Sequence, residues 1–133
     1  MVKHSNIQDI QAEVAFCNNF MESIVNLPQY DTLASTPRLK STIYLSKAAL
    51  KLQGDFVETG VYRGGTTAIM MKLLMQFDKT RKLYAFDSFE GLPAPNSMDG
   101  DNSFGIQGVK GSINASFGEF IYNLKIPSMK LCQ

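Results

Sequence analysis

The stretch Gly54–Gly65, GDFVETGVYRGG, decides how the rest of this sequence is interpreted. A short apolar run ends at Glu58, and glycines follow at positions 60, 64 and 65. A strand that leads through a glycine turn into a helix presents backbone N–H groups at the positive end of the helix dipole, where electron-rich ligands bind. Such glycines also occur where the chain needs only a tight turn, so the motif alone does not establish a ligand site.

The segments after this stretch predict one βαβ unit over residues 55–87. Residues 55–59 are expected to form a strand, residues 66–77 a strongly apolar helix, and residues 83–86 a second strand. This crossover places the two strands parallel in one sheet. Glu58 and Asp87 are therefore predicted to meet at the carboxyl edge of the sheet, where open α/β sheets bind ligands.

Helices are expected on the N-terminal side of this unit. Residues 9–26 carry apolar residues at helical spacing, and this spacing predicts a core-facing stripe made of Ile10, Val14, Cys17, Met21, Ile24 and Val25. Thr36 is expected to cap a second helix that has Pro37 in its first turn and runs to about Leu52. Lys47 interrupts the apolar stripe of this second helix, which indicates a face near the surface.

The C-terminal side is expected to contribute a loop, a helix and a strand. The loop spans residues 87–111 and is long enough to be functional or mobile. Residues 112–124 are predicted to form a helix, and residues 128–132 a third strand. The connector 30–36 and the loop segment 96–111 are candidate lids.

Composition excludes several classes of protein. The chain has 133 residues, 44% hydrophobic and 19% charged, and a net charge of +1, so nothing favours binding to nucleic acid or to an anionic membrane. No apolar run approaches the length of a transmembrane helix, and the N-terminus lacks a signal-peptide core. Cys17 and Cys132 have no metal-type spacing and are expected to be reduced thiols. These features predict a cytoplasmic protein.

Three ligand classes use a strand, a glycine turn and a helix N-terminus. A phosphate loop needs a lysine where Thr66 stands, and a dinucleotide fingerprint needs a glycine where Tyr62 stands. S-adenosylmethionine (SAM) has no pyrophosphate, but it needs an acidic residue after the second strand to accept bonds from the ribose hydroxyls. Asp87 supplies that carboxylate, although NAD-binding proteins use the same feature.

Two motifs, Gly54–Gly65 and Asp87–Pro93 (DSFEGLP), resemble the macrocin O-methyltransferase family of the TylF and MycF type. The resemblance implies a SAM-dependent O-methyltransferase with a class I methyltransferase (Rossmann-like) α/β fold. Known members of the family methylate sugar hydroxyls of macrolide antibiotics. The expected partner is therefore a small-molecule hydroxyl acceptor, such as a sugar.

The resemblance also implies roles for individual residues. Those expected at the methionine end of SAM are Glu58, Thr59 and Gly60, with Val61 and Tyr62 beside them. Those expected to shape the turn into the helix are Gly64, Gly65 and Thr66. Asp87 is expected to hold the ribose, with Ser88 and Phe89 against the adenosine. Arg63 is interpreted either as a surface cation or as a ligand-binding residue.

The chain departs from the family pattern after the predicted third strand. The family continues with aspartates that bind a divalent metal, expected to be Mg²⁺, and that supply the catalytic base. Asp99 and Asp101 precede that position and are interpreted as solvated loop acids, and His4 as part of a frayed terminus. No catalytic or metal-binding residue is therefore assigned in this chain.

We accordingly expect a fold truncated after about three parallel strands. Residues 1–53 form its N-terminal helical segment, and residues 54–133 form the first half of the SAM-binding domain. An alternative is a non-catalytic module whose exposed strand, residues 55–59, pairs with another chain and allows self-association.

Overall fold

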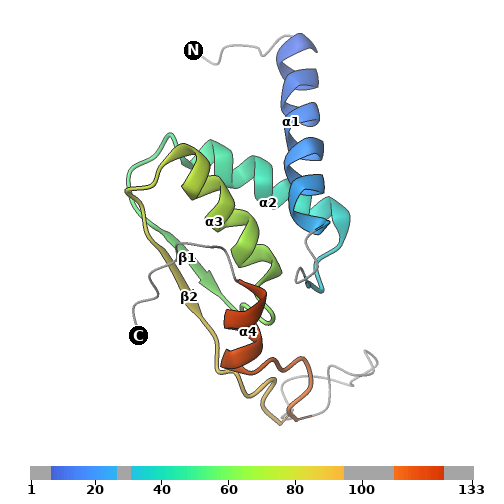
Figure 1. Ribbon diagram of the computed structural model, residues 1–133, viewed down its shortest axis with the longest axis vertical. Coiled ribbons are helices and arrows are strands. Elements are labelled where there is room, and N and C mark those ends of the chain that lie inside the picture. Colours follow the sequence, from blue (N-terminus) through green and yellow to red (C-terminus); the bar gives the residue numbers. More distant parts are fainter. Residues whose placement is uncertain (1–6, 27–30, 95–109, 125–133) are drawn as a thin grey trace.

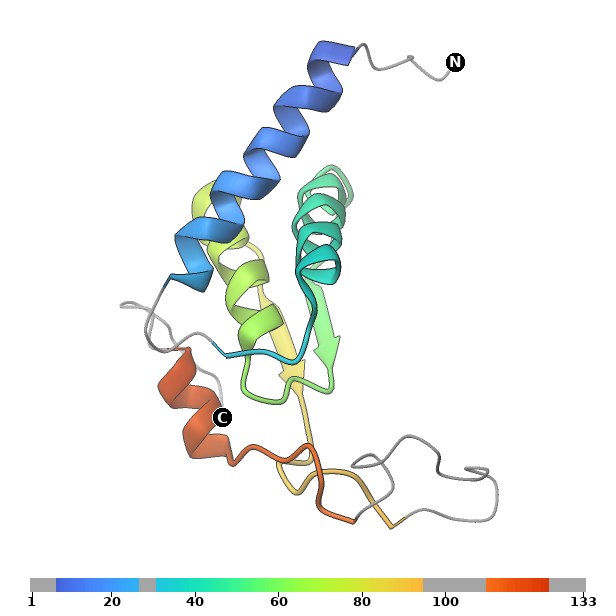
Figure 2. The same cartoon turned by 90° about the vertical axis from the view of Figure 1, so that its right-hand side faces the viewer.

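The computed structural model describes residues 7–26, 31–94 and 110–124. In chain order its elements are α1 (Ile7–Val25), α2 (Thr36–Ala49), β1 (Phe56–Thr59), α3 (Gly65–Phe77), β2 (Leu83–Phe86) and α4 (Phe117–Asn123). In Figure 1, α2 and α3 lie on the same side of the two strands, and α4 lies beyond the carboxyl ends of the strands. Figure 2 shows the same arrangement from the side of the helices.

The two strands are parallel, as the βαβ pattern predicts. Phe56 is paired with Leu83, and Thr59 with Phe86. Side chains alternate between the two faces of each strand, with the half-buried residues facing the helices and the exposed ones on the other face. Val57 and Tyr84 lie on that exposed face, where no described element covers them. The structure therefore confirms a mixed α/β chain with a parallel sheet.

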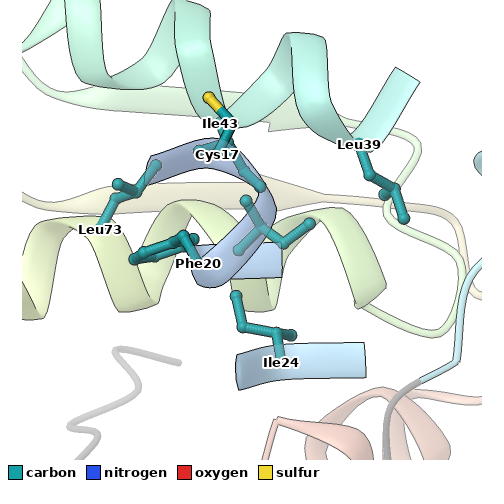
Figure 3. Packing of buried hydrophobic residues seen from close by; sticks show 7 residues of the cluster. Cys17, Phe20, Ile24, Leu39, Ile43 and Leu73 are labelled. Carbon is teal, nitrogen blue, oxygen red and sulfur yellow. The ribbon is translucent and has the colours of Figure 1, made fainter. Parts of the chain in front are cut away.

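One hydrophobic core joins the two N-terminal helices to α3. Its buried members are Cys17, Phe20 and Ile24 of α1, Leu39 and Ile43 of α2, and Ile69 and Leu73 of α3 (Figure 3). The predicted burial of the Cys17 thiol is confirmed. Burial, together with the nearby carboxylate of Glu13, raises the pKa of Cys17, which keeps the thiol protonated and unreactive.

The predicted core stripe of α1 is correct for only half of the helix. Cys17 and Ile24 are buried, whereas Ile10, Val14 and, at the other end of the helix, Val25 are exposed. In Figures 1 and 2 the first turns of α1 stand clear of α2 and α3, so no described element is there to bury Ile10 and Val14. Helical periodicity identifies an apolar face, but it cannot show how far the neighbouring helices extend.

Two details of α2 differ from prediction. The N-cap position is Ser35 and not Thr36, and its side chain makes no capping hydrogen bond. Lys47 does not merely mark a surface face: its ammonium group forms an ion pair with Glu13 of α1 at 2.9 Å and lies 4.0 Å from the centre of the Phe16 ring. The cation that interrupts the apolar stripe therefore helps to join α1 to α2.

The helix predicted over residues 112–124 is shorter than expected. It begins after Ser116, which accepts a hydrogen bond from the Glu119 N–H while the Glu119 carboxylate accepts one from the Ser116 N–H. This capping box sets the start of the helix. Ile113, expected inside the helix, has φ 52°, which is incompatible with a right-handed helix.

Several predictions fall on residues outside the described part of the chain. These are the third strand 128–132, the loop acids Asp99 and Asp101, the thiol Cys132, the terminal His4 and most of the candidate lid 96–111. They remain predictions.

None of the described helices is both long and apolar enough to cross a membrane.

Candidate functional site

The carboxyl ends of β1 and β2 lie side by side and lead into the two predicted motifs. The Gly60 N–H donates to the Phe86 carbonyl at 2.8 Å, which continues the ladder one residue beyond β1. Asp87 follows directly after β2, and Thr59 and Gly60 are exposed at the same edge. Parallel pairing therefore brings together two stretches that are far apart in the sequence.

Asp87 holds the glycine turn in place. Its Oδ2 accepts hydrogen bonds from the N–H groups of Val61 at 2.8 Å and Tyr62 at 3.1 Å, and its Oδ1 accepts one from Phe89 at 2.9 Å. Partial burial opposes ionisation, but the backbone donors of Phe89, Tyr62, Val61 and Ser88 together outweigh it and lower the pKa of Asp87. The carboxylate is therefore charged and anchored at neutral pH.

These bonds change what Asp87 can offer a ribose. A carboxylate has about four lone-pair sites, and three of them already accept bonds from the backbone. Both oxygens are engaged before any ligand arrives, so Asp87 organises the turn in addition to its predicted contact with the ribose. That contact remains a prediction.

Glu58 points toward the base of α3. Thr67 Oγ1 donates a hydrogen bond to Glu58 Oε2 at 2.5 Å. Burial raises the pKa of Glu58, and the bond from Thr67 offsets only part of this effect. Thr66, in the first turn of α3, was expected to shape the turn, and that role remains a prediction. Sequence reasoning did not select Thr67, which is the residue that contacts Glu58. Helical spacing shows which of Thr66 and Thr67 faces Glu58 only when the direction of the Glu58 side chain is known.

The turn Gly60–Gly65 needs glycine at specific positions. Gly64 is the N-cap of α3 in the left-handed region, with φ 84°, which a side chain rarely adopts. Gly65 has ordinary helical geometry, but an added Cβ would overlap the Asp31 carbonyl oxygen and the Thr32 side chain. Tyr62 also lies in the left-handed region, with φ 50°. The turn therefore combines backbone strain with close packing against the connector that precedes α2.

Arg63 forms ion pairs that its sequence position did not predict, and the choice between a surface cation and a ligand-binding residue remains a prediction. Its Nη1 pairs with Asp31 Oδ2 at 2.5 Å, and its Nη2 lies 3.6 Å from Glu119 Oε1. Asn123 Nδ2 donates to the Arg63 carbonyl at 3.1 Å. The hydrogen bond that Arg63 donates to the Asp31 carboxylate raises the pKa of Arg63. Arg63 thus links the turn to the connector and to α4, and no local signal could have identified partners so distant in sequence.

Ser88 and Phe89 begin a turn after Asp87. The Ser88 hydroxyl accepts a bond from the Glu90 N–H at 3.2 Å. The Phe89 ring packs edge-on against Phe117 at 5.3 Å and lies 5.6 Å from Phe120. Phe89 is thus part of the cluster formed with α4, and its predicted contact with adenosine would use whatever ring surface that cluster leaves exposed.

Within residues 7–26, 31–94 and 110–124, no group of three or more His, Cys, Asp or Glu side chains is arranged to hold a metal ion.

The fold and this edge define a class of protein: an α/β chain whose parallel strands end beside a glycine turn and two carboxylates. The family is more specific. Residues 36–116 match the model of the macrocin-O-methyltransferase (TylF) family, and the chain belongs to that family. The matched range begins at the last residue of the connector 30–36 and includes both motifs and α3.

Relatives with assigned reactions cover parts of the chain. The chain is 30% identical over 93 residues to the mycinamicin III 3''-O-methyltransferase of Micromonospora griseorubida, which is 67% of this chain and 37% of the relative. It is 38% identical over 65 residues to the 8-demethyl-8-(2,3-dimethoxy-alpha-L-rhamnosyl)-tetracenomycin-C 4'-O-methyltransferase of Streptomyces olivaceus, which is 47% of this chain and 25% of the relative. The chain therefore matches well under half the length of these relatives. No solved structure matches it significantly.

Proposed function

We propose that this chain is the cofactor-binding part of a SAM-dependent O-methyltransferase with a class I, Rossmann-like fold. The proposed acceptor is a hydroxyl group of a sugar or another small molecule. The observation that carries the proposal is the pair of anchored carboxylates, Glu58 and Asp87, at adjacent strand ends in a chain of the TylF family. Support for the acceptor comes from the names of the two relatives, which describe 3''-O- and 4'-O-methylation.

The residues present fit SAM. A Cβ added at Gly60 would meet no atom within 4 Å, so the turn leaves open space at the exposed strand edge. The Glu58 carboxylate can attract the ammonium group of the methionine portion, because the two charges are opposite. By accepting hydrogen bonds from Val61 and Tyr62, Asp87 holds the backbone of the turn in a fixed geometry, which reduces the entropy lost on binding. SAM would supply the activated methyl group.

Other parts of the proposed reaction involve groups not yet assigned. The acceptor hydroxyl loses a proton during transfer. In the family that the sequence resembles, a base or a divalent metal such as Mg²⁺ is expected to assist that step. Neither is assigned to a residue of this chain. A cytoplasmic location remains a prediction from composition.

The experiment is a calorimetric titration of the chain with SAM, with NADH as the competing dinucleotide. Asp87→Asn is the test variant and Asp55→Asn is its matched control. Asp55 also accepts a backbone bond, from the Lys82 N–H at 2.9 Å, but it precedes β1 and lies at the opposite end of the strands. Both variants replace a carboxylate that accepts backbone N–H groups with an amide, at opposite ends of the strands; Asp87 accepts three such bonds and Asp55 accepts one.

We expect saturable SAM binding without an NADH response. Asp87→Asn should weaken it about tenfold or more, because the amide cannot accept all three backbone bonds and the turn loses its geometry. Asp55→Asn should leave the affinity for SAM unchanged. Equal losses in both variants would show a general effect of folding, and NADH binding without SAM binding would favour the dinucleotide alternative.

A further inference from the structure

Arg63 ties the glycine turn to two segments that lie outside it. Its Nη1 pairs with Asp31 Oδ2 of the connector at 2.5 Å, and its Nη2 lies 3.6 Å from Glu119 Oε1 in the first turn of α4. Its carbonyl accepts a hydrogen bond from Asn123 Nδ2, also of α4, at 3.1 Å. Figure 2 shows the connector that leads into α2 passing beside the turn at the start of α3. One residue therefore joins three segments that are distant in the sequence.

The turn needs such support because its backbone is strained on both sides of Arg63. Tyr62 has φ 50° and Gly64 has φ 84°, both in the left-handed region. A left-handed residue other than glycine costs free energy and persists where the surrounding structure holds it. Asp87 holds the first part of the turn through the N–H groups of Val61 and Tyr62. Arg63 supplies charged contacts on the side that leads into α3.

Close packing surrounds the turn on the sides where the partners of Arg63 lie. A Cβ added at Gly64 would lie 3.0 Å from the Phe120 ring of α4, and one added at Gly65 would overlap the Asp31 carbonyl oxygen. The turn is thus packed against both α4 and the connector, and Arg63 pairs with a carboxylate of each. A displacement of either segment would reach the turn through these contacts.

The contacts of the Arg63 guanidinium favour positioning over contact with a ligand. Both terminal nitrogens face protein carboxylates, which balance its charge. Its Nε is buried and has no hydrogen-bond partner among the described residues. The guanidinium carbon also lies 5.4 Å from the centre of the Tyr62 ring, so the cation restrains the strained residue beside it. A planar guanidinium can bridge two carboxylates in this way, whereas a lysine ammonium is a single point charge.

We infer that Arg63 is a positioning residue for the proposed SAM site: through Asp31 and Glu119 it holds the turn Gly60–Gly65 in the geometry that binds the cofactor. The inference rests on the proposed function, because it assigns a role in SAM binding at that turn. It adds to the site two carboxylates that neither sequence motif contains. Its consequence is that the Asp31 carboxylate, which belongs to the connector, contributes to SAM affinity through Arg63.

The test is a double-mutant cycle in which SAM affinity is measured by calorimetry. The variants are Arg63→Gln, Asp31→Asn and the two together. The matched controls, Arg81→Gln and Asp78→Asn, break another ion pair between an arginine and an aspartate, at 2.8 Å, in the segment between α3 and β2. In Figure 1 that segment lies at the opposite end of the strands from the turn Gly60–Gly65. Thermal melts of each variant show whether it is folded.

We expect the wild-type chain to bind SAM, and Arg63→Gln and Asp31→Asn each to weaken binding by roughly threefold to tenfold. The effect is modest because both side chains of the pair are partly exposed to water. The double variant should bind about as weakly as Arg63→Gln alone, because residues that act through one contact give non-additive losses. The control variants should lower the melting temperature and leave the affinity for SAM unchanged.

Three outcomes would overturn the inference and leave the proposed function intact. Unchanged SAM affinity in either single variant would show that the turn keeps its geometry without the ion pair, and Asp31→Asn provides this test even if Arg63→Gln does not fold. Losses that add in the double variant would show that Arg63 acts on SAM directly and not through Asp31. Equal losses in the controls would show a general effect of folding.

A fourth outcome concerns the proposed function itself. A wild-type chain that does not bind SAM would overturn both that function and the role of Arg63 in it.

Discussion

The helical core and the carboxyl edge of the sheet are held together by different forces. In the helical core, seven buried side chains from α1, α2 and α3 pack without any charged member. At the strand edge, the turn Gly60–Gly65 is held by Asp87, by Arg63 with its carboxylate partners, and by the bond from Thr67 to Glu58. A smaller apolar cluster that includes Val61 and Phe120 supports the turn from one side.

The difference between the two regions is physical. Apolar burial is non-directional and tolerates many sequences, which suits a scaffold. Hydrogen bonds to charged groups fix positions and angles, which suits a turn whose backbone must hold one geometry. Substitutions in the core should therefore change mainly stability, whereas substitutions at the edge should change SAM affinity more than stability.

The largest effect on stability is expected in the core. Leu73→Ala should lower the free energy of unfolding by about 2–5 kcal/mol, because Leu73 is fully buried and a cavity remains. Leu45→Ala removes the same atoms from an exposed side chain and should change stability by less than about 0.5 kcal/mol. Urea unfolding measures the free energy of unfolding of both variants. Equal losses would show that burial does not determine the cost of removing these side-chain atoms.

Gly65 joins the two regions, because it packs the start of α3 against the connector before α2. Gly65→Ala should cost about 1–3 kcal/mol, since the new Cβ displaces Asp31 and Thr32 and disturbs the Arg63 ion pair. The control Gly118→Ala lies in α4, where the nearest atom to a new Cβ is 3.8 Å away, and it should be neutral or slightly stabilising. A neutral Gly65→Ala would show that the connector adjusts freely.

Asp87→Asn should destabilise the chain by about 1–2 kcal/mol, a small figure because Asp87 is only partly buried and water replaces some lost bonds. Its pKa is lowered in the folded state, so its contribution is present above the ordinary aspartate pKa and is lost as pH falls through the lowered value. Unfolding curves at several pH values should therefore converge with those of the variant at acid pH. Parallel curves would contradict the charged role of Asp87.

Glu58→Gln should have the smallest effect on stability and the opposite sign. Burial raises the pKa of Glu58 in the folded state. The free energy of unfolding therefore falls as pH rises from the ordinary glutamate pKa through the raised value. The amide keeps an acceptor for Thr67 and should stabilise the chain by less than about 1 kcal/mol at neutral pH. SAM affinity should fall at the same time. Stabilisation with full affinity would remove Glu58 from the proposed site.

Local patterns predicted the elements that depend on neighbouring residues. The apolar run of α3, the strands on either side of it and their parallel pairing follow from periodicity and from the length of the crossover. Glu58 and Asp87 were selected from the glycine turn and the strand ends, whereas the motif residues around them were selected from the resemblance to the family. The structure brings both carboxylates to the edge where the turn begins.

Other features depended on neighbours that are distant in sequence. The start of α4 was placed too early because the spacing of Ile113 and Phe117 is helical, whereas the capping box at Ser116 and Glu119 sets the boundary. The sequence could not predict that Arg63 pairs with Asp31 and Glu119, because no sequence pattern indicates contacts between such distant positions. Ile10 and Val14 were assigned to the core, although α2 and α3 do not extend far enough to cover them.

The sequence by itself determined the order of the described helices and strands, the parallel βαβ unit and the position of the two motifs, because these depend on spacing and on the chemistry of single side chains. Only the tertiary structure decided that Asp87 anchors the turn, that Thr67 contacts Glu58, that Arg63 links the connector to α4, and that the α1 stripe is bare at its N-terminal end. The reason is that hydrogen bonds, ion pairs and burial depend on which surfaces meet, and this is set by packing between segments that are far apart along the chain.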